Sequence, residues 1–431
     1  MTAAPVAPGM EGLRTDAAPP LSIPLSFFLV SPLAMMATGT LLVWGGEGVF
    51  ASRWSPLAMA ATHLGTLGFL GAAMIGALYQ LLPVVAGAPV PAVRMAHAVH
   101  ALLVVGVGAL ATGLATGAAT FLALAPAFLL GAFLLFLIPA LVAVARTSTK
   151  SETVWGMRLA LLGLLGVAAL GAFMALARAG YVQSTANWGG YVAAHAALGG
   201  AVWVGGLLTA ISWQVVPMFY LTPPLPEWSR LATLGAQGLA LTSLPCVLLV
   251  GGGGPAAVAL CIAPLALMVW LVHPVLVVRA LRARRRRRVD GSVRFWWLAM
   301  ALAPAVPLLA ALSLASDDGR FPVALGWLFV WGWAGAVVHG MLTRIVPFLI
   351  WFHRYASQVG LVPVPSMREL LPDTRIRAAM VLHALAVTAG LLAILSRSSW
   401  LARATGAGLF ATGALLTLNL VQALLPRRDR A

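Results

Sequence analysis

ATHLGTLGFLGAAMIGALYQLLPVVAGAPVPAVRMAHAVH, residues 61–100, is the stretch that decides the fold. An apolar run rich in glycine and alanine begins at His63 and ends in the letters YQLLP at Pro83. A short turn with glycine and proline follows, and a second apolar run begins near His97. Each run reaches the roughly 20 residues that a helix needs to cross the hydrocarbon core of a bilayer.

The whole chain shares this composition. Of its 431 residues, 61% are hydrophobic and 9% are charged, whereas a soluble domain carries roughly 25% charged residues. Backbone groups inside a bilayer must satisfy one another, so spanning segments are helices or strands of a closed barrel. Barrel strands alternate in hydrophobicity, and the apolar runs here are continuous. The sequence therefore predicts an all-α transmembrane protein.

We predict about twelve helices in a single membrane domain, residues 22–425, between a disordered tail at 1–21 and a basic tail at 426–431. The expected spans are residues 22–46, 56–86, 96–118, 119–145, 157–178, 188–221, 230–250, 254–280, 295–315, 321–352, 377–396 and 398–425. The first twenty residues lack the basic start and apolar core of a signal peptide. Cys246 and Cys261 lie in apolar runs and predict no disulfide framework.

Basic residues predict the orientation, because cytoplasmic loops are enriched in lysine and arginine. All but six of the 27 fall on one side of the predicted spans; the others are Arg53, Arg178, Arg320, Arg397 and Arg403 on the opposite side and Arg344 within a span. We therefore expect both termini in the cytoplasm, at a bacterial-type inner membrane. The run 284–288 lies between two spans, which favours contact with anionic headgroups. Without interleaved aromatic residues it does not predict nucleic-acid binding.

Three segments near the ends of the second, sixth and tenth spans can be aligned. GALYQLLPVV, AISWQVVPMF and GMLTRIVPFL match at Pro83, Pro217 and Pro347, and each has a polar residue three positions earlier: Gln80, Gln214 and Arg344. The alignment predicts three pseudo-repeats of four helices, at about 22–145, 157–280 and 295–425.

The helix after each proline also matches between the repeats. Arg94 precedes His100 by the same interval at which Arg377 precedes His383, and Gln237 falls near the same place in the middle repeat. Tyr79, beside Gln80, belongs to the first of these segments.

The eleven acidic residues all fall outside the apolar runs. An ionisable residue inside a membrane is costly and usually functional, so a buried carboxylate would have indicated an ion path. Its absence from the runs argues against a carboxylate relay for proton or sodium pumping and against catalysis by paired carboxylates.

Histidine is the titratable residue that the spans do contain. His63 and His195 each begin the second helix of a repeat among Gly, Ala and Leu, and His339 lies in the middle of the tenth span. Imidazole is a common ligand of haem iron and of copper. We predict His63, His195 and His339 as cofactor ligands, and His63 and His195 as metal ligands; core packing or contact with the interface is the alternative for each.

A second group of candidates lies toward the cytoplasmic side. His97, His100 and His383 begin helices there and are candidates for a second cluster, with interfacial capping as the alternative. Arg344 is expected to pair with a haem propionate or a lipid headgroup, or to extend to the cytoplasmic face.

The stretch from His63 to Met95 resembles the second and third helices of heme-copper oxidase subunit I. In that family a histidine opens helix two and ligates the low-spin haem. An aromatic, polar, aliphatic and proline element then closes the helix before an Ile-Gly-Ala-Pro-like turn and an Arg-Met pair. Here the element is Tyr79–Pro83, and Arg94 and Met95 follow the turn. The resemblance implies twelve helices in three pseudo-repeats, bound haem with copper as a further candidate, and His63 as a haem ligand.

The chain also departs from that family. The stretch 229–250 has no counterpart of the copper-ligating histidine pair on helix seven, and helix ten offers only His339, with Trp327 near the expected ligand depth. His195 is a loose counterpart of the copper ligand on helix six. The missing ligands argue against oxygen or nitric-oxide reduction at a binuclear centre. The chain instead resembles divergent members of the superfamily that are associated with the nitric-oxide response.

We therefore expect an integral membrane haem- or copper-binding protein that acts in redox sensing, nitric-oxide tolerance or metal handling. Its expected partners are the lipid bilayer and other respiratory or metal-handling subunits. The sequence leans away from an enzyme; an enzyme of this type would be a heme-copper oxidoreductase. One alternative is a multi-pass permease without redox chemistry, and another is a divergent terminal oxidase or nitric-oxide reductase subunit.

Overall fold

The computed structural model describes residues 17–184, 187–249, 253–285 and 289–425. The predicted tail at 426–431, most of the tail at 1–21 and the basic residues 286–288 lie outside these ranges. In the described part the chain is helical, without strands, and twelve of its helices are long and apolar enough to cross a membrane. The prediction of an all-α protein with about twelve membrane helices is confirmed.

The boundaries agree with the predicted ones to within a few residues. The spans, in order, are α1 and η2 (Ser22–Gly45, Gly46–Val49); α2, η3 and α3 (Pro56–His63, Leu64–Gly71, Ala72–Ala86); η4 and α4 (Val93–Met95, Ala96–Thr116); α5 (Ala119–Arg146); α6 (Glu152–Arg178); α7, η5 and α8 (Trp188–Ala197, Leu198–Gly205, Gly206–Tyr220); α9 (Glu227–Leu249); α10, η6 and α11 (Pro255–Leu267, Met268–Val272, His273–Arg282); α12 and α13 (Gly291–Leu302, Ala305–Ala315); α14, η7, α15 and η8 (Arg320–Trp327, Leu328–Ala334, Gly335–Tyr355, Ala356–Gln358); α17 (Asp373–Ser396); and α18 (Ser399–Leu424). The short α16 (Met367–Leu370) lies in the loop before α17.

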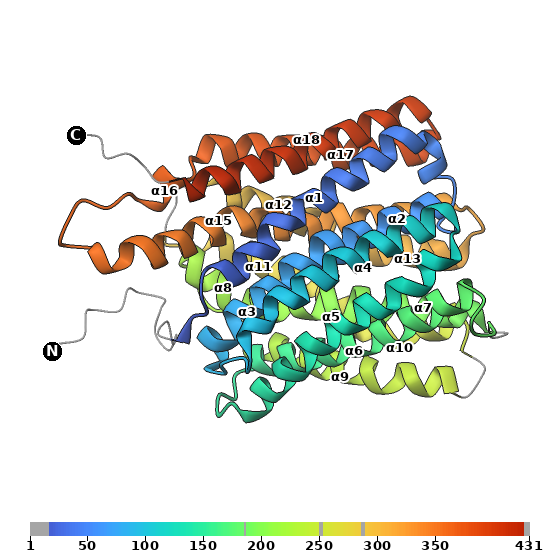
Figure 1. The fold of residues 1–431 in the computed structure, drawn as a ribbon, viewed down its shortest axis with the longest axis horizontal. Coiled ribbons are helices and arrows are strands. Elements are labelled where there is room, and N and C mark those ends of the chain that lie inside the picture. The colour runs from blue at the N-terminus through green and yellow to red at the C-terminus, as the bar shows by residue number, and fades with distance from the viewer. Residues whose placement is uncertain (1–16, 185–186, 250–252, 286–288, 426–431) are drawn as a thin grey trace.

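The helices lie side by side along the long axis of the bundle, and α1 begins at the same end of the bundle at which α18 finishes (Figure 1). Exposed tryptophans occur near both ends: Trp44, Trp54 and Trp400 near one, and Trp155 and Trp228 near the other. Tryptophan is enriched where a helix meets the membrane–water interface. Their placement agrees with a bundle that contacts the lipid bilayer along its length.

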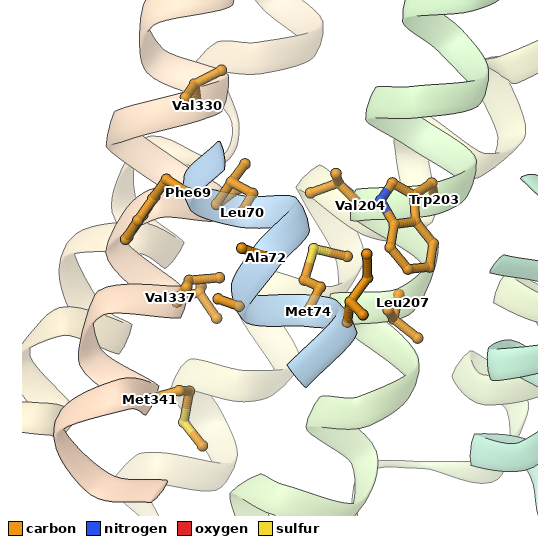
Figure 2. Close-up of a cluster of buried hydrophobic side chains, with 14 of the residues drawn as sticks. Phe69, Leu70, Ala72, Met74, Trp203, Val204, Leu207, Val330, Val337 and Met341 are labelled. Carbon is orange, nitrogen blue, oxygen red and sulfur yellow. The ribbon is translucent and has the colours of Figure 1, made fainter. Parts of the chain in front are cut away.

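Spans two, six and ten form the centre of the bundle. In their most apolar windows 78%, 67% and 72% of the residues are buried, whereas no other span exceeds 44%. Figure 2 shows side chains from all three elements meeting there, including Phe69 and Met74, Trp203 and Leu207, and Val337. The three spans with the aligned prolines are therefore the ones that the other helices surround.

Each central span contains a π-helical segment, in which the turns are widened. The segments η3, η5 and η7 begin at the same interval before the matched prolines: Leu64 before Pro83, Leu198 before Pro217 and Leu328 before Pro347. A fourth, η6, lies in span eight. Widened turns alter the backbone hydrogen-bond ladder and frequently mark functional sites. The sequence analysis did not predict them.

The first and last spans, α1 and α18, form the most extensive helix pair in the described chain. They approach closely because Gly39 faces Gly406: a Cβ atom on Gly39 would lie 2.6 Å from the Gly406 carbonyl oxygen, and one on Gly406 would lie 2.6 Å from that of Gly39. Small residues at a crossing allow this close approach inside membranes.

Candidate metal centre and buried histidine pair

His63 and His195 face each other across spans two and six. Their ring centroids are 6.2 Å apart and the ring planes are inclined by 31°. His63 is the last residue of α2, and His195 lies near the end of α7. With a rise of 1.5 Å per residue, both lie about 10 Å from the end at which their helices begin. The sequence predicted similar depths for the two imidazoles, and the structure shows that they meet.

The tautomer of His63 is set by its own helix. Its Nδ1 atom lies 2.8 Å from the carbonyl oxygen of Met59, one turn earlier. A carbonyl oxygen only accepts, so Nδ1 carries the hydrogen and Nε2 carries the lone pair. Metal-binding histidines are commonly oriented by such a hydrogen bond to the nitrogen that does not bind the metal.

His195 is positioned by a glycine on α6. Its Nδ1 atom is buried, and the backbone of Val167, on the same helix as the glycine, interacts with the imidazole. A Cβ atom on Gly171 would lie only 3.0 Å from Cε1 of the imidazole, so the missing side chain provides the space that the ring occupies. Sequence reasoning missed Gly171, because it is one of several glycines in an apolar run and has no distinguishing pattern.

The third central span contributes tryptophan at the matching place. Trp327 precedes Pro347 by the interval at which His63 precedes Pro83. Its indole Nε1–H donates to the Val387 carbonyl oxygen at 2.9 Å, so it is occupied in helix packing. Across the described ranges, no group of three or more His, Cys, Asp or Glu side chains is arranged to hold a metal ion. Within those ranges, no third His, Cys, Asp or Glu side chain joins His63 and His195 in such a group.

The third predicted ligand, His339, is paired with His383 of α17. Both rings are fully buried, and their Nδ1 atoms are 3.3 Å apart. Phe295 of α12 packs on the His339 ring with centroids 4.5 Å apart. His383 was expected at an interface, but it lies inside the bundle.

The hydrogen bonds fix both tautomers of this pair. Nε2 of His383 is 2.8 Å from the carbonyl oxygen of Trp331 and must donate to it. Its Nδ1 therefore accepts from Nδ1–H of His339. The Nε2 atom of His339 is left with a lone pair that is buried and has no partner among the described residues.

Trp331 belongs to the π-helical segment η7, and a similar contact occurs at η5. There Gln237 of α9 donates from Nε2 to the carbonyl oxygen of Val202 at 3.0 Å. Gly206 leaves room for the Gln237 amide, since a Cβ at that position would overlap it. Gln237 and His383 are the residues that the repeat alignment matched. In both cases a side chain from the following span satisfies a carbonyl within a widened turn.

His97, His100 and His383, the candidates for a second cluster, have different surroundings in the structure. His97 is exposed, His100 packs edge-on against Phe27 of α1 at 5.2 Å, and His383 binds His339. The reason is the packing of the third and eleventh spans: α4 lies against α2 and α5, whereas α17 lies against α12 and α18. His100 and His383 therefore lie on helices with different neighbours.

Arg344 is bound by protein groups near the end of the bundle where the described chain begins. Its guanidinium donates to the Phe219 carbonyl oxygen at 3.1 Å and lies 3.6 Å from a carboxylate oxygen of Asp290. Tyr220 lies beside it, with the guanidinium 6.0 Å from the ring centroid. Asp290 therefore supplies the negative charge beside Arg344 that was predicted to come from a haem propionate or a lipid headgroup.

The remaining predicted residues have separate surroundings. Tyr79 is buried between Phe27 and Phe136, with ring centroids 5.7 and 5.3 Å away. Gln80 is buried, whereas Gln214 is only partly buried. None of the three contacts the His63–His195 pair through an interaction that the described structure contains.

No protein-family model matches the chain, and no curated protein matches it.

Proposed function

We propose that the protein is an integral membrane protein of the heme-copper oxidase subunit I type that binds copper or haem iron between His63 and His195. It would act in redox sensing, nitric-oxide response or metal handling rather than in proton pumping. The observation that carries the proposal is the approach of two imidazoles from different central spans, far apart in the chain, to a centroid distance of 6.2 Å.

That distance suits one metal between two rings. Metal–imidazole bonds are about 2.0–2.1 Å long, so rings on opposite sides of one ion have centroids about 6 Å apart. The Met59 carbonyl holds the hydrogen of His63 on Nδ1, which leaves Nε2 free to bind. The space beside Gly171 accommodates the His195 ring next to that of His63.

The number of ligands narrows the choice of metal. Structural zinc sites use four protein ligands and catalytic sites use three, and the described residues supply two at this place. Copper(I) accepts two nitrogen ligands, and haem iron takes four from its porphyrin and needs only two axial imidazoles. Either metal, when bound, would supply one-electron redox chemistry.

The protein's own contribution would be to hold the two imidazoles, which belong to partly buried residues. Gly65 and Gly171 allow neighbouring side chains to approach, and Trp331 packs beside Gly65 and stacks on Phe69 with centroids 5.6 Å apart. The buried polar residues of the described chain are all uncharged types or histidine. This composition agrees with a role that does not move protons through carboxylates.

Several observations support the repeats that the resemblance implies. The three most buried spans are two, six and ten, each carries a π-helical segment at the matched position, and Gln237 and His383 make matched contacts. We include three pseudo-repeats of four helices, and cytoplasmic termini at a bacterial-type inner membrane, in the proposal.

The test is metal content. Wild-type protein, purified in detergent without added metal and again after incubation with copper(I), is examined by elemental analysis and by absorption in the Soret region. We expect about one copper or one haem per chain, and at least a tenfold weaker affinity in His63→Ala and in His195→Ala, because one of two protein ligands is lost in each. His97→Ala is the matched control, since His97 is exposed.

Two results would contradict the proposal. One is folded wild-type protein that carries and takes up neither copper nor haem, which would favour the permease alternative. The other is wild-type affinity in both site variants, which would place any bound metal elsewhere.

A further inference from the structure

A cavity whose outer part has a single polar side chain lies along the axis of the bundle; Ser212 and Trp296 line its inner part. Two adjoining spaces of about 50 and 60 Å³ lie between α3, α8 and α15. Five residues line both of them, so they form one passage, which we call the axial cavity; these residues are Phe28, Ala77, Leu81, Val215 and Ile345. Neither space is lined by His63 or His195.

The axial cavity runs from one end of the bundle toward its middle. Its outer part is lined by Ala18 and Phe352, near the end at which α1 begins, and its inner part by Met74 and Val337. Partly buried residues line the outer part, so a molecule dissolved in the bilayer interface has a short route into it.

The polar group is the side-chain amide of Gln80. This residue is 8% exposed, lines the outer part of the cavity, and its Oε1 atom has no hydrogen-bond partner among the described residues. A buried acceptor without a donor destabilises the fold, because it has lost its hydrogen bond to water. A group left in this state in a native fold calls for an explanation, such as a ligand that supplies the donor.

The walls around Gln80 are aromatic. Phe219 and Phe348 meet edge to face at 5.5 Å, and Phe348 stacks with Phe352 at 6.2 Å. Phe28 lies on the opposite wall, from α1. Rings arranged in this way pack favourably against another ring in an edge-to-face or offset geometry.

We propose that the axial cavity binds a lipid-soluble phenolic molecule, with its ring among the phenylalanines and its hydroxyl donating to Oε1 of Gln80. A hydrocarbon chain would fill the space between the walls but would leave Oε1 of Gln80 without a hydrogen-bond donor. Water would pair that oxygen but would wet an apolar surface. A phenol satisfies both requirements, and this site is independent of the proposed metal centre.

The test compares two probes that differ by the hydroxyl hydrogen. Binding of para-fluorophenol and para-fluoroanisole to detergent-solubilised protein is followed by fluorine NMR, with empty micelles as the blank. We expect saturable binding of the phenol, about five- to tenfold tighter than that of the ether, which is the usual worth of one hydrogen bond. Gln80→Leu should remove this preference.

Matched variants separate the site from general effects. Gln214→Leu changes the residue aligned with Gln80 in span six, which does not line the cavity, and should keep the preference. Ala77→Leu, or Leu81→Phe if the first does not fold, should block both probes by filling the passage. Equal affinities for the two probes in wild type, an unchanged preference in Gln80→Leu, or unchanged binding in the blocking variants would each overturn the proposal.

Discussion

Replacing His383 with leucine is expected to lower the free energy of unfolding by about 2–4 kcal/mol, because two buried groups lose their partners at about 1–3 kcal/mol each. The carbonyl oxygen of Trp331 would lose its donor, and Nδ1–H of His339 would lose its acceptor. Both groups lie in a fully buried region where water does not replace the lost hydrogen bonds. The measurement is denaturant-induced unfolding of purified protein in mixed micelles.

A glutamine at the same position should recover part of the loss. Gln237 of α9 donates to the Val202 carbonyl within η5 in a similar contact, so His383→Gln keeps a donor for Trp331. We expect it to be less destabilised than His383→Leu, and His97→Leu, at an exposed position, to change stability little. Equal stability of wild type and His383→Leu would show that the buried pair contributes nothing to the fold.

An alanine at Gly406 is expected to destabilise the protein by about 3 kcal/mol, at the upper end of the usual cost of overpacking. Its Cβ would lie 2.6 Å from the Gly39 carbonyl oxygen and 2.6 Å from the backbone nitrogen of Val43. These are backbone atoms, so no side chain can rotate away, and α1 and α18 would have to separate. Thermal unfolding followed by size-exclusion chromatography in detergent measures the effect.

The control for this variant lies two residues away on the same helix. A Cβ on Gly408 would lie 3.4 Å from the Cβ of Ala386, at the short edge of ordinary contact. Gly408→Ala should therefore be neutral or slightly stabilising, since alanine favours a helix over glycine by up to about 1 kcal/mol. If the two variants behave alike, the close approach of Gly39 and Gly406 is not what limits the α1–α18 contact.

The helices were predictable because length and hydropathy determine them almost alone. Span two was expected at residues 56–86, and the structure places it at Pro56–Ala86. The depths of His63 and His195 followed from their distance to the aligned prolines. Their meeting did not, because it depends on how spans two and six turn about their axes, and that rotation is set by packing.

The missed features depend on contacts between distant segments. No local pattern in the sequence predicted the π-helical segments; within η7 the Trp331 carbonyl accepts a hydrogen bond from His383 of another span. His383 packs with His339 and not with His100, because α17 lies against α12 and α18, whereas α4 lies against α2 and α5. The role of Gly171 could be recognised only in the structure, where the His195 ring lies beside it.

The packing of the first span against the last has a practical consequence for protein engineering. Since α1 and α18 touch along their length and the described ends lie at one end of the bundle, the helical ring is closed by contact and not by the polypeptide. A linker joining residue 17 to residue 425, with a new opening cut in the exposed residues 359–361, would leave every neighbouring pair of helices in place. In such a circular permutant, different helices would come first and last in the chain, while every helix would keep its place in the bundle.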